Sequence, residues 1–289
     1  MTAILLAVSL FVGQPEGRLL VGAGNRVAIL DRSGEVLWQY PAANVHDAWM
    51  LPNGNVLFGD GKAITEVTPD KKVLFQFKSQ STRHDAVYAC QRLANGNTLV
   101  GENATGRVLE VDPTGRIVFT LQTPFAAENN HHNMRMVRKL DNGHYLVCHS
   151  GKNLVREYKP DGTVVFEIKA KALAFAAIRT PQNTTLVSSL GQVTEYDSTG
   201  KEFWEFQAAA DAPGVVIRNM TGLHLLPNGN IVIGCYSAYT KDGQGTGLLE
   251  ITRDKKIVWR FANPSFAGSI MAVQKLTPDG QVLPGLTLR

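Results

Sequence analysis

The chain has 289 residues, of which 44% are hydrophobic, so it is able to bury a core and is not expected to be disordered. Its 29 Lys and Arg against 25 Asp and Glu give a net charge of +4, and the scatter of these charges argues against a nucleic-acid-binding module. No apolar run reaches the roughly 18 residues that a membrane-spanning helix needs.

The N-terminal segment Ala3–Val12 is apolar except for Ser9. Its length is typical of the core of a signal peptide and too short for a transmembrane helix. We therefore predict a signal peptide over residues 1–13, a single domain over residues 14–289, and a periplasmic or secreted protein. The alternative is an outer strand of the fold, because no Lys or Arg precedes the run; the protein is then cytoplasmic.

Three cysteines, Cys90, Cys148 and Cys235, each lie within an apolar, strand-like run. Their number is odd and no C-x-x-C pair occurs, so we predict buried free thiols and no cysteine zinc site.

A motif of a turn followed by a strand recurs along the chain and predicts β-hairpins. Its clear copies are LPNGNVLFG from Leu51, LANGNTLVG from Leu93, LDNGHYLVC from Leu140 and LPNGNIVIG from Leu226. Asn-Gly between two apolar runs is typical of a tight hairpin. We expect a type I′ turn, in which both central residues have a positive φ.

A second motif, two strands around a polar turn with an aromatic residue in the second strand, occurs six times. Its aromatic residues are Trp38, Phe75, Phe119, Phe166, Trp204 and Trp259. The first and last lie five steps apart, at about 44 residues per step, and such a period of short strands is typical of propeller blades. We predict an all-β, six-bladed β-propeller of four-stranded antiparallel blades, with the repeated aromatic residue packed between adjacent blades.

The two ends of the chain indicate how the ring closes. The first repeat begins at Arg18 and lacks its innermost strand, whereas Ser269–Leu276 is an innermost strand without the rest of its blade. We expect this C-terminal strand to complete the first blade by pairing with the N-terminal strands, which removes the free edges between them.

Polar residues gather in the loops that a propeller places on one face, around its central channel. Five of the seven histidines fall there, and histidine both titrates near neutral pH and binds metals, so we predict a functional site on this face. The candidate catalytic residues are His132, His84 and His46. The candidate substrate-binding residues are His131, Asn133, Asp47, Asp85, His149, Arg218, Asn219, Tyr239 and Lys241.

Two of these histidines are followed directly by an aspartate, Asp47 or Asp85. Neighbours on a strand point to opposite sides, so neither aspartate is expected to orient its own histidine. In a ring, the aspartate of one blade is able to reach the histidine of the next. The alternative is that both aspartates accept hydrogen bonds from nearby backbone N–H groups.

The segments from His46 to Phe77 and from His84 to Phe119 resemble the repeat of the arylsulfotransferase-like propellers. The segment AILDRSGEVLWQY resembles the tryptophan-docking repeat of quinoprotein-like (PQQ-like) propellers. The resemblance covers about Arg18 to Leu276. It implies sulfuryl transfer between phenols through a histidine, without a metal, and His132 in the HHN segment near Arg135 is our candidate nucleophile.

The sequence departs from the family pattern in two blades. Ala174–Ala177, which includes Phe175, replaces a polar rim and offers a wall for an apolar or sugar ring, and Arg218-Asn219 replaces His-Asp.

Three functions stay open on these residues. The first is an exported propeller whose histidine-rich pocket binds a polar or anionic small molecule, with arylsulfotransferase-like group transfer as its sharpest form. The second is a non-catalytic propeller that binds a ligand or a protein partner. The third is a carbohydrate lyase or hydrolase in which histidines, with Asp47, Asp85 or Glu102, bind a divalent metal, the one cofactor considered.

Overall fold

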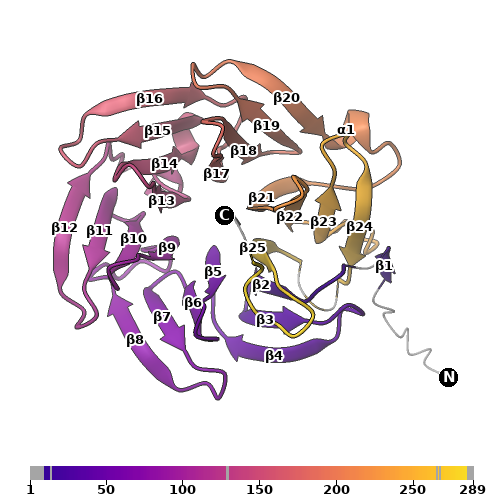
Figure 1. The fold of residues 1–289 in the computed structure, drawn as a ribbon, viewed down its shortest axis with the longest axis horizontal. Helices are drawn as coiled ribbons and strands as arrows, with labels where there is room; N and C mark the ends of the chain where they lie inside the picture. The colour runs from indigo at the N-terminus through magenta and orange to yellow at the C-terminus, as the bar shows by residue number, and fades with distance from the viewer. Residues whose placement is uncertain (1–9, 14, 128–129, 265, 267, 285–289) are drawn as a thin grey trace.

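The computed structural model describes residues 10–13, 15–127, 130–264, 266 and 268–284, which form a ring of six antiparallel sheets (Figure 1). This is the predicted six-bladed β-propeller. The helical elements in the described ranges are the short α1 (Ala208–Asp211), η1 (Asn130–His132) and η2 (Ser150–Lys152). No helix in those ranges is long and apolar enough to cross a membrane.

Each blade contains four strands, ordered from the central channel to the circumference. The innermost strands are β25 (Ile270–Lys275), β5 (Asp47–Met50), β9 (Ala89–Arg92), β13 (Val137–Lys139), β17 (Ala176–Arg179) and β21 (Asn219–Leu225). The second strands are β2 (Leu19–Ala23), β6 (Val56–Gly59), β10 (Thr98–Glu102), β14 (Tyr145–His149), β18 (Thr185–Ser189) and β22 (Ile231–Tyr236). The third strands are β3 (Arg26–Leu30), β7 (Ala63–Val67), β11 (Arg107–Val111), β15 (Leu154–Tyr158), β19 (Gln192–Tyr196) and β23 (Leu248–Ile251). The outermost strands are β4 (Val36–Pro41), β8 (Val73–Lys78), β12 (Ile117–Gln122), β16 (Val164–Lys169), β20 (Glu202–Gln207) and β24 (Ile257–Ala262). We number the blades 1 to 6 in the order of these lists.

Blade 1 closes the ring as the sequence predicts. The C-terminal strand β25 pairs with β2, in a register that places Leu19 opposite Lys275 and Val21 opposite Val273. Backbone hydrogen bonds join the two segments beyond the strands, because the Leu276 N–H donates to the Arg18 carbonyl at 2.8 Å. The two ends of the propeller therefore share one sheet.

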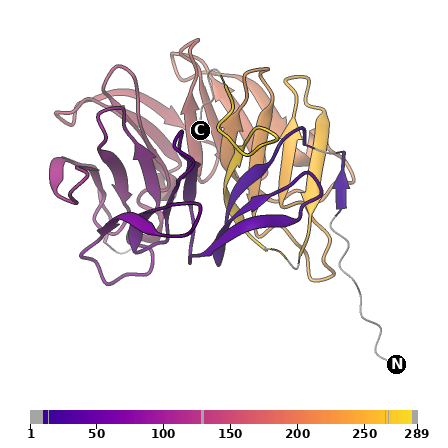
Figure 2. The same ribbon diagram turned by 60° about the horizontal axis from the view of Figure 1, so that its bottom comes forward.

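The end of the expected signal segment forms a fifth strand on blade 6. This strand, β1 (Leu10–Val12), pairs with β24 on the outside of the ring, where Figures 1 and 2 show it. These three residues follow the outer-strand alternative. The rest of the apolar segment, through residue 9, lies outside the described residues.

The hairpin turns differ from the expected type I′. In each Asn-Gly copy the glycine has a positive φ and the asparagine does not, as at Gly54 with a φ of 82°. The Leu51 N–H donates to the Asn55 carbonyl at 2.8 Å, so three residues form the loop instead of two. This is a turn that ends in one left-handed residue, and it needs glycine only there. The type I′ prediction is therefore wrong.

The repeated aromatic residues join neighbouring blades. The Trp38 indole of blade 1 donates to the Pro69 carbonyl of blade 2 at 2.8 Å, and the Trp204 indole of blade 5 donates to the Arg253 carbonyl of blade 6 at 2.9 Å. The core between the sheets also buries the three cysteines as free thiols, as predicted.

Candidate functional site

A cavity of about 370 Å³ opens where the loops that enter the innermost strands meet around the channel. Four of the five predicted histidines line it: His46, His84, His131 and His132. They come from blades 2, 3 and 4, which are neighbours in the ring. The loops between blades thus bring together residues that are far apart in the sequence.

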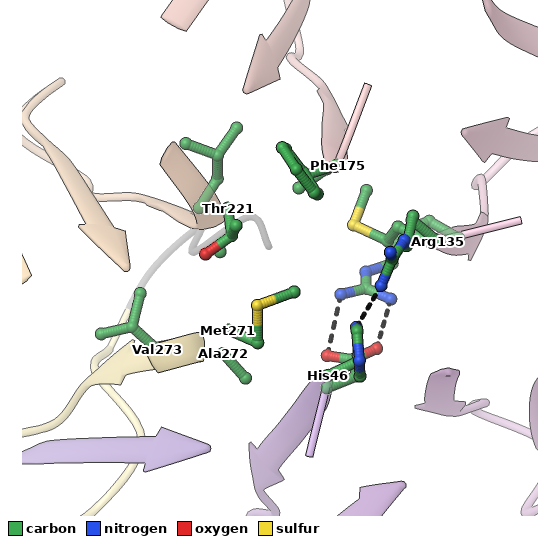
Figure 3. Close-up of a pocket in the computed structure, with 13 residues that line it drawn as sticks. His46, Arg135, Phe175, Thr221, Met271, Ala272 and Val273 are labelled. Carbon is green, nitrogen blue, oxygen red and sulfur yellow. Dashed lines mark hydrogen bonds and ion pairs between the residues drawn. The ribbon is translucent and has the colours of Figure 1, made fainter. Parts of the chain in front are cut away.

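Arg135, just before β13, lies at the centre of this group. Its Nη1 donates to His46 Nδ1 at 3.2 Å, and its Nη2 lies 3.0 Å from His131 Nε2 and 3.2 Å from His132 Nδ1. Figure 3 shows the contact with His46. A guanidinium only donates, so each of these three ring nitrogens accepts and carries no proton in this arrangement. The remaining nitrogen of each neutral ring then carries the proton.

The guanidinium of Arg135 has no carboxylate partner among the described residues, although the residue is only 8% exposed. Its Nε is buried and has no hydrogen-bond acceptor there. The rings of Tyr88 and Phe175 lie 4.8 and 5.8 Å from the guanidinium carbon. Burial lowers the pKa of Arg135, yet an arginine stays charged in proteins, so the site holds an uncompensated positive charge.

Asp85 of blade 3 reaches His131 of blade 4, which is the cross-blade arrangement considered from the sequence. Asp85 Oδ2 lies 2.9 Å from His131 Nδ1 and 2.6 Å from Arg83 Nη2. Burial alone would raise the pKa of Asp85, but the hydrogen bonds from Arg83 and His131 outweigh it and lower the pKa. The ionised carboxylate accepts the Nδ1 proton of His131, whose Nε2 faces Arg135.

Two of the histidines around Arg135 are held in the neutral form. Burial lowers the pKa of His46 well below its ordinary value, and the positive charge of Arg135 lowers it further. The pKa of His132 is lowered by the same two causes in the same order. At neutral pH both rings are therefore neutral hydrogen-bonding groups beside one permanent cation.

Asp47 does not contact a histidine ring. It forms a two-bonded ion pair with Arg138 at 2.7 and 3.1 Å, and it accepts from the Cys90 N–H at 3.0 Å. Both side chains are buried in the channel below Arg135, beside a small cavity of about 30 Å³. Asp47 therefore joins three blades and lies outside the upper cavity.

His149 is buried between strands and does not line the cavity. Its Nε2 lies 2.7 Å from the Tyr158 hydroxyl and its Nδ1 lies 3.2 Å from the Asn133 carbonyl, so both nitrogens have partners. Burial lowers its pKa to about 4. The Asn133 side chain bonds to both backbone groups of Ala126, which fixes the loop before β13.

The remaining predicted residues are dispersed. Asn219 lines the cavity, whereas Arg218 and Lys241 are exposed and do not. The Tyr239 hydroxyl accepts from the Asn263 N–H at 2.8 Å, within blade 6. His84 is exposed at the rim of the cavity.

The histidine and carboxylate side chains expected to bind a divalent metal do not form a metal site within the described residues. Across the described ranges, no group of three or more His, Cys, Asp and Glu side chains is arranged to hold a metal ion. Arg135 occupies the point where the imidazole lone pairs converge, and its charge repels a cation. The Glu102 carboxylate forms an ion pair with Arg107 at 2.6 Å, and Glu102 does not line the cavity.

The repeat itself contains a further signal, which identifies the residues around the central channel. Each innermost strand leads into a hairpin turn that begins at Leu51, Leu93, Leu140, Thr180, Leu226 or Thr277. The residues five positions before these are His46, Tyr88, Arg135, Phe175, Thr221 and Ala272. Five of them, all except Tyr88, line the small cavity, and all except Thr221 and Ala272 line the upper one. An alignment of the turns therefore gives the ring of residues at the floor of the site.

A larger cavity, of about 830 Å³, lies at the hairpin turns of blades 2 and 3. Its charged residues, Glu66 and Arg92, pair with each other at 2.5 Å, so neither has a free charge for a ligand. We therefore place the candidate site at Arg135.

No protein-family model matches the sequence, and no curated protein matches it. Solved structures with similar folds include a protein of unknown function from Bacteroides caccae, at 22% identity and a TM-score of 0.77, over 90% of this chain and 98% of that one. Virginiamycin B lyase from Staphylococcus aureus is 12% identical with a TM-score of 0.56, over 88% of this chain and 98% of that one. The extracellular domain of a putative hybrid two-component system from B. thetaiotaomicron is 16% identical with a TM-score of 0.58, over 100% of this chain and 40% of that one. These likenesses show the propeller fold.

Proposed function

We propose that this chain is an exported propeller that binds a small organic anion in the cavity around Arg135. The observation that carries the proposal is the buried guanidinium without a carboxylate partner among the described residues. A buried charge without a partner is costly, and an anionic ligand at this position offsets that cost. Non-catalytic ligand binding and group transfer would both begin with this binding step.

The hydrogen bonds of Arg135 also prepare its neighbours for an anion. Because Nδ1 of His46 and of His132 accept from Arg135, the proton of each neutral ring lies on Nε2. Both rings line the cavity, and each carries its one N–H donor on the side of the ring away from the guanidinium. Hydrogen bonds in which one partner is charged are stronger than those between two neutral groups.

Group transfer of the arylsulfotransferase kind is the second candidate, and the Asp85–His131 pair favours it. A carboxylate on Nδ1 stabilises the positive charge that a histidine gains when its Nε2 takes up a group. This observation makes His131 a better candidate nucleophile than His132. His131 Nε2 accepts a hydrogen bond from Arg135. The reaction therefore requires that the bound anion accept this hydrogen bond instead, which frees the Nε2 lone pair.

Export is part of the proposal because the apolar segment Ala3–Val12 has the length of a signal-peptide core, although its last three residues pair with β24 as strand β1. The extracellular domain among the structures of similar fold supports it. N-terminal sequencing of the protein from the medium or periplasm, compared with protein from the cytoplasm, tests this part alone.

Calorimetric titration with benzoate and with benzamide, its neutral isostere, tests the binding function. We expect saturable binding of benzoate and at least tenfold weaker binding of benzamide. Arg135→Met should abolish benzoate binding with an unchanged circular dichroism spectrum. Arg218→Met is the matched control on the same face and should bind as the wild type does. Equal binding of the two compounds, or benzoate binding by Arg135→Met, would refute the proposal.

The transfer candidate is tested with p-nitrophenyl sulfate as donor and a phenol as acceptor. Release of p-nitrophenol that depends on the acceptor and is lost in His131→Gln supports transfer. Binding of the donor without release leaves binding as the function.

A further inference from the structure

The cavity around Arg135 has two chemically different halves. Blades 2, 3 and 4 contribute the polar half: Asn44, His46, His84, His131 and His132, with Tyr88 and Arg135. Blades 5, 6 and 1 contribute the other half: Leu173, Phe175, Leu190, Asn219, Tyr236 and Met271. Only one residue of this second half, Asn219, has a purely polar side chain. The boundary passes through the contact between the Arg135 guanidinium and the Phe175 ring.

Parts of the apolar half face the cavity instead of the core. Leu190 is 42% exposed and Tyr236 is 43% exposed, although both line the cavity. Phe175 and Met271 are buried at its floor, where Figure 3 shows them facing His46 and Arg135 across the channel. A set of apolar side chains exposed inside a concave site is typical of a binding surface for an apolar group.

The charge of the cavity limits the charge of the ligand. Arg135 is the one permanently charged residue that lines it within the described part of the chain. Arg83 is already paired with Asp85, and Arg218 lies outside the lining. One guanidinium compensates one negative charge, and the second charge of a dianion would have to be desolvated without a partner.

We infer that the ligand is an organic monoanion with a compact apolar body, whose charged group contacts Arg135 and whose body packs against Phe175 and Leu190. This inference rests on the proposed function and adds the substrate class to it. The volume of about 370 Å³ is near the lower end for small-molecule sites, so the body is small. Carboxylates, sulfonates and sulfate monoesters share this chemistry, and inorganic sulfate and phosphate lack the apolar body.

The test is a calorimetric series of acetate, butanoate, hexanoate and octanoate. We expect the affinity to rise about fourfold per added methylene until the cavity is filled, which corresponds to about 0.8 kcal/mol for each buried CH₂ group. Succinate has the length of butanoate and a second carboxylate, and it should bind at least tenfold more weakly. A comparison of the affinities of hexane-1-sulfonate and hexanoate shows whether the site prefers a sulfonate or a carboxylate head group.

Two leucine variants locate the apolar body. Leu190→Asn should reduce the gain per methylene and leave acetate binding unchanged. Leu74→Asn is the matched control, because Leu74 is 53% exposed on β8, outside the cavity lining. It should give the wild-type series.

The outcomes separate this inference from the proposed function. Equal affinity for acetate and octanoate, or succinate binding as well as butanoate, overturns the inference and leaves anion binding in place. A series that rises equally in Arg135→Met shows apolar binding without anion recognition and overturns both. Absence of binding by every member of the series also overturns both.

Discussion

Asp85 and His131 belong to neighbouring blades, and Asp85 Oδ2 lies 2.9 Å from His131 Nδ1 while Arg135 Nη2 lies 3.0 Å from His131 Nε2. The ring is therefore fixed between an acceptor and a donor. Carboxylate and guanidinium together determine which nitrogen carries the proton, since the first only accepts and the second only donates.

Replacement of Asp85 by alanine should release the Nδ1 proton of His131. In the wild type we expect a protonated Nδ1 and an unprotonated Nε2, visible in ¹H–¹⁵N correlation spectra of histidine-labelled protein, with His131→Gln for assignment. The Tyr88 hydroxyl also lies 3.1 Å from Nδ1, so Asp85→Ala is combined with Tyr88→Phe, and in this double variant the Nδ1 proton should broaden by exchange with water. A spectrum of His131 that is the same in both proteins would show that Asp85 does not select the tautomer.

The Asp47–Arg138 pair should contribute strongly to stability. Asp47→Asn leaves the Arg138 guanidinium buried in the channel without its carboxylate, and breaking such a pair costs about 3–5 kcal/mol. Glu167→Gln is the control, because it breaks a pair with Arg156 in which Glu167 is 44% exposed, and exposed pairs contribute about 0–1 kcal/mol. Urea unfolding of both variants measures the difference. A loss for Asp47→Asn no larger than that of the control would contradict a structural role for the pair.

The contrast between Asp47 and Asp85 shows what the sequence can predict. Blade number and ring closure follow from local turns and aromatic residues that repeat in every blade, so they are readable along the chain. The two aspartates each follow a histidine and look equivalent in sequence, yet one pairs with Arg138 and the other with His131. Their partners lie on other blades, so the choice depends on the channel that the six blades form together. The sequence indicates Arg135 as a neighbour of His132 but does not predict it as the centre of the site, for the same reason: its importance comes from residues of several blades.

The aromatic contact between blades 5 and 6 gives a further prediction. Trp204→Phe removes the hydrogen bond to the Arg253 carbonyl and reduces the ring that faces the Arg253 guanidinium, 4.2 Å from its centre. We expect a loss of about 1–2 kcal/mol in the free energy of unfolding. Phe203→Leu, on the neighbouring residue with 56% exposure, should change it by no more than about 0.5 kcal/mol. Similar losses for both variants would indicate that the contact between blades adds nothing.

His149 should make the fold less stable in acid. Its pKa is lowered from an ordinary 6.5 to about 4, because burial disfavours the charged ring. The unfolded chain therefore binds a proton more readily than the folded one between these two values. His149 therefore costs the fold nothing above pH 6.5, where the ring is neutral in both states. The free energy of unfolding decreases as the pH falls from 6.5 toward 4, by about 2 kcal/mol between pH 8 and pH 5. Urea unfolding at these two pH values measures this loss.

His46 and His132 act in the same direction, so the loss of stability in the wild-type protein is larger than that from His149 alone, and His149→Gln should reduce it by about 2 kcal/mol. His84→Gln, at an exposed histidine of the same face, should retain the full loss. An equal pH dependence in wild type and His149→Gln would mean that His149 is already protonated or is solvated in the fold.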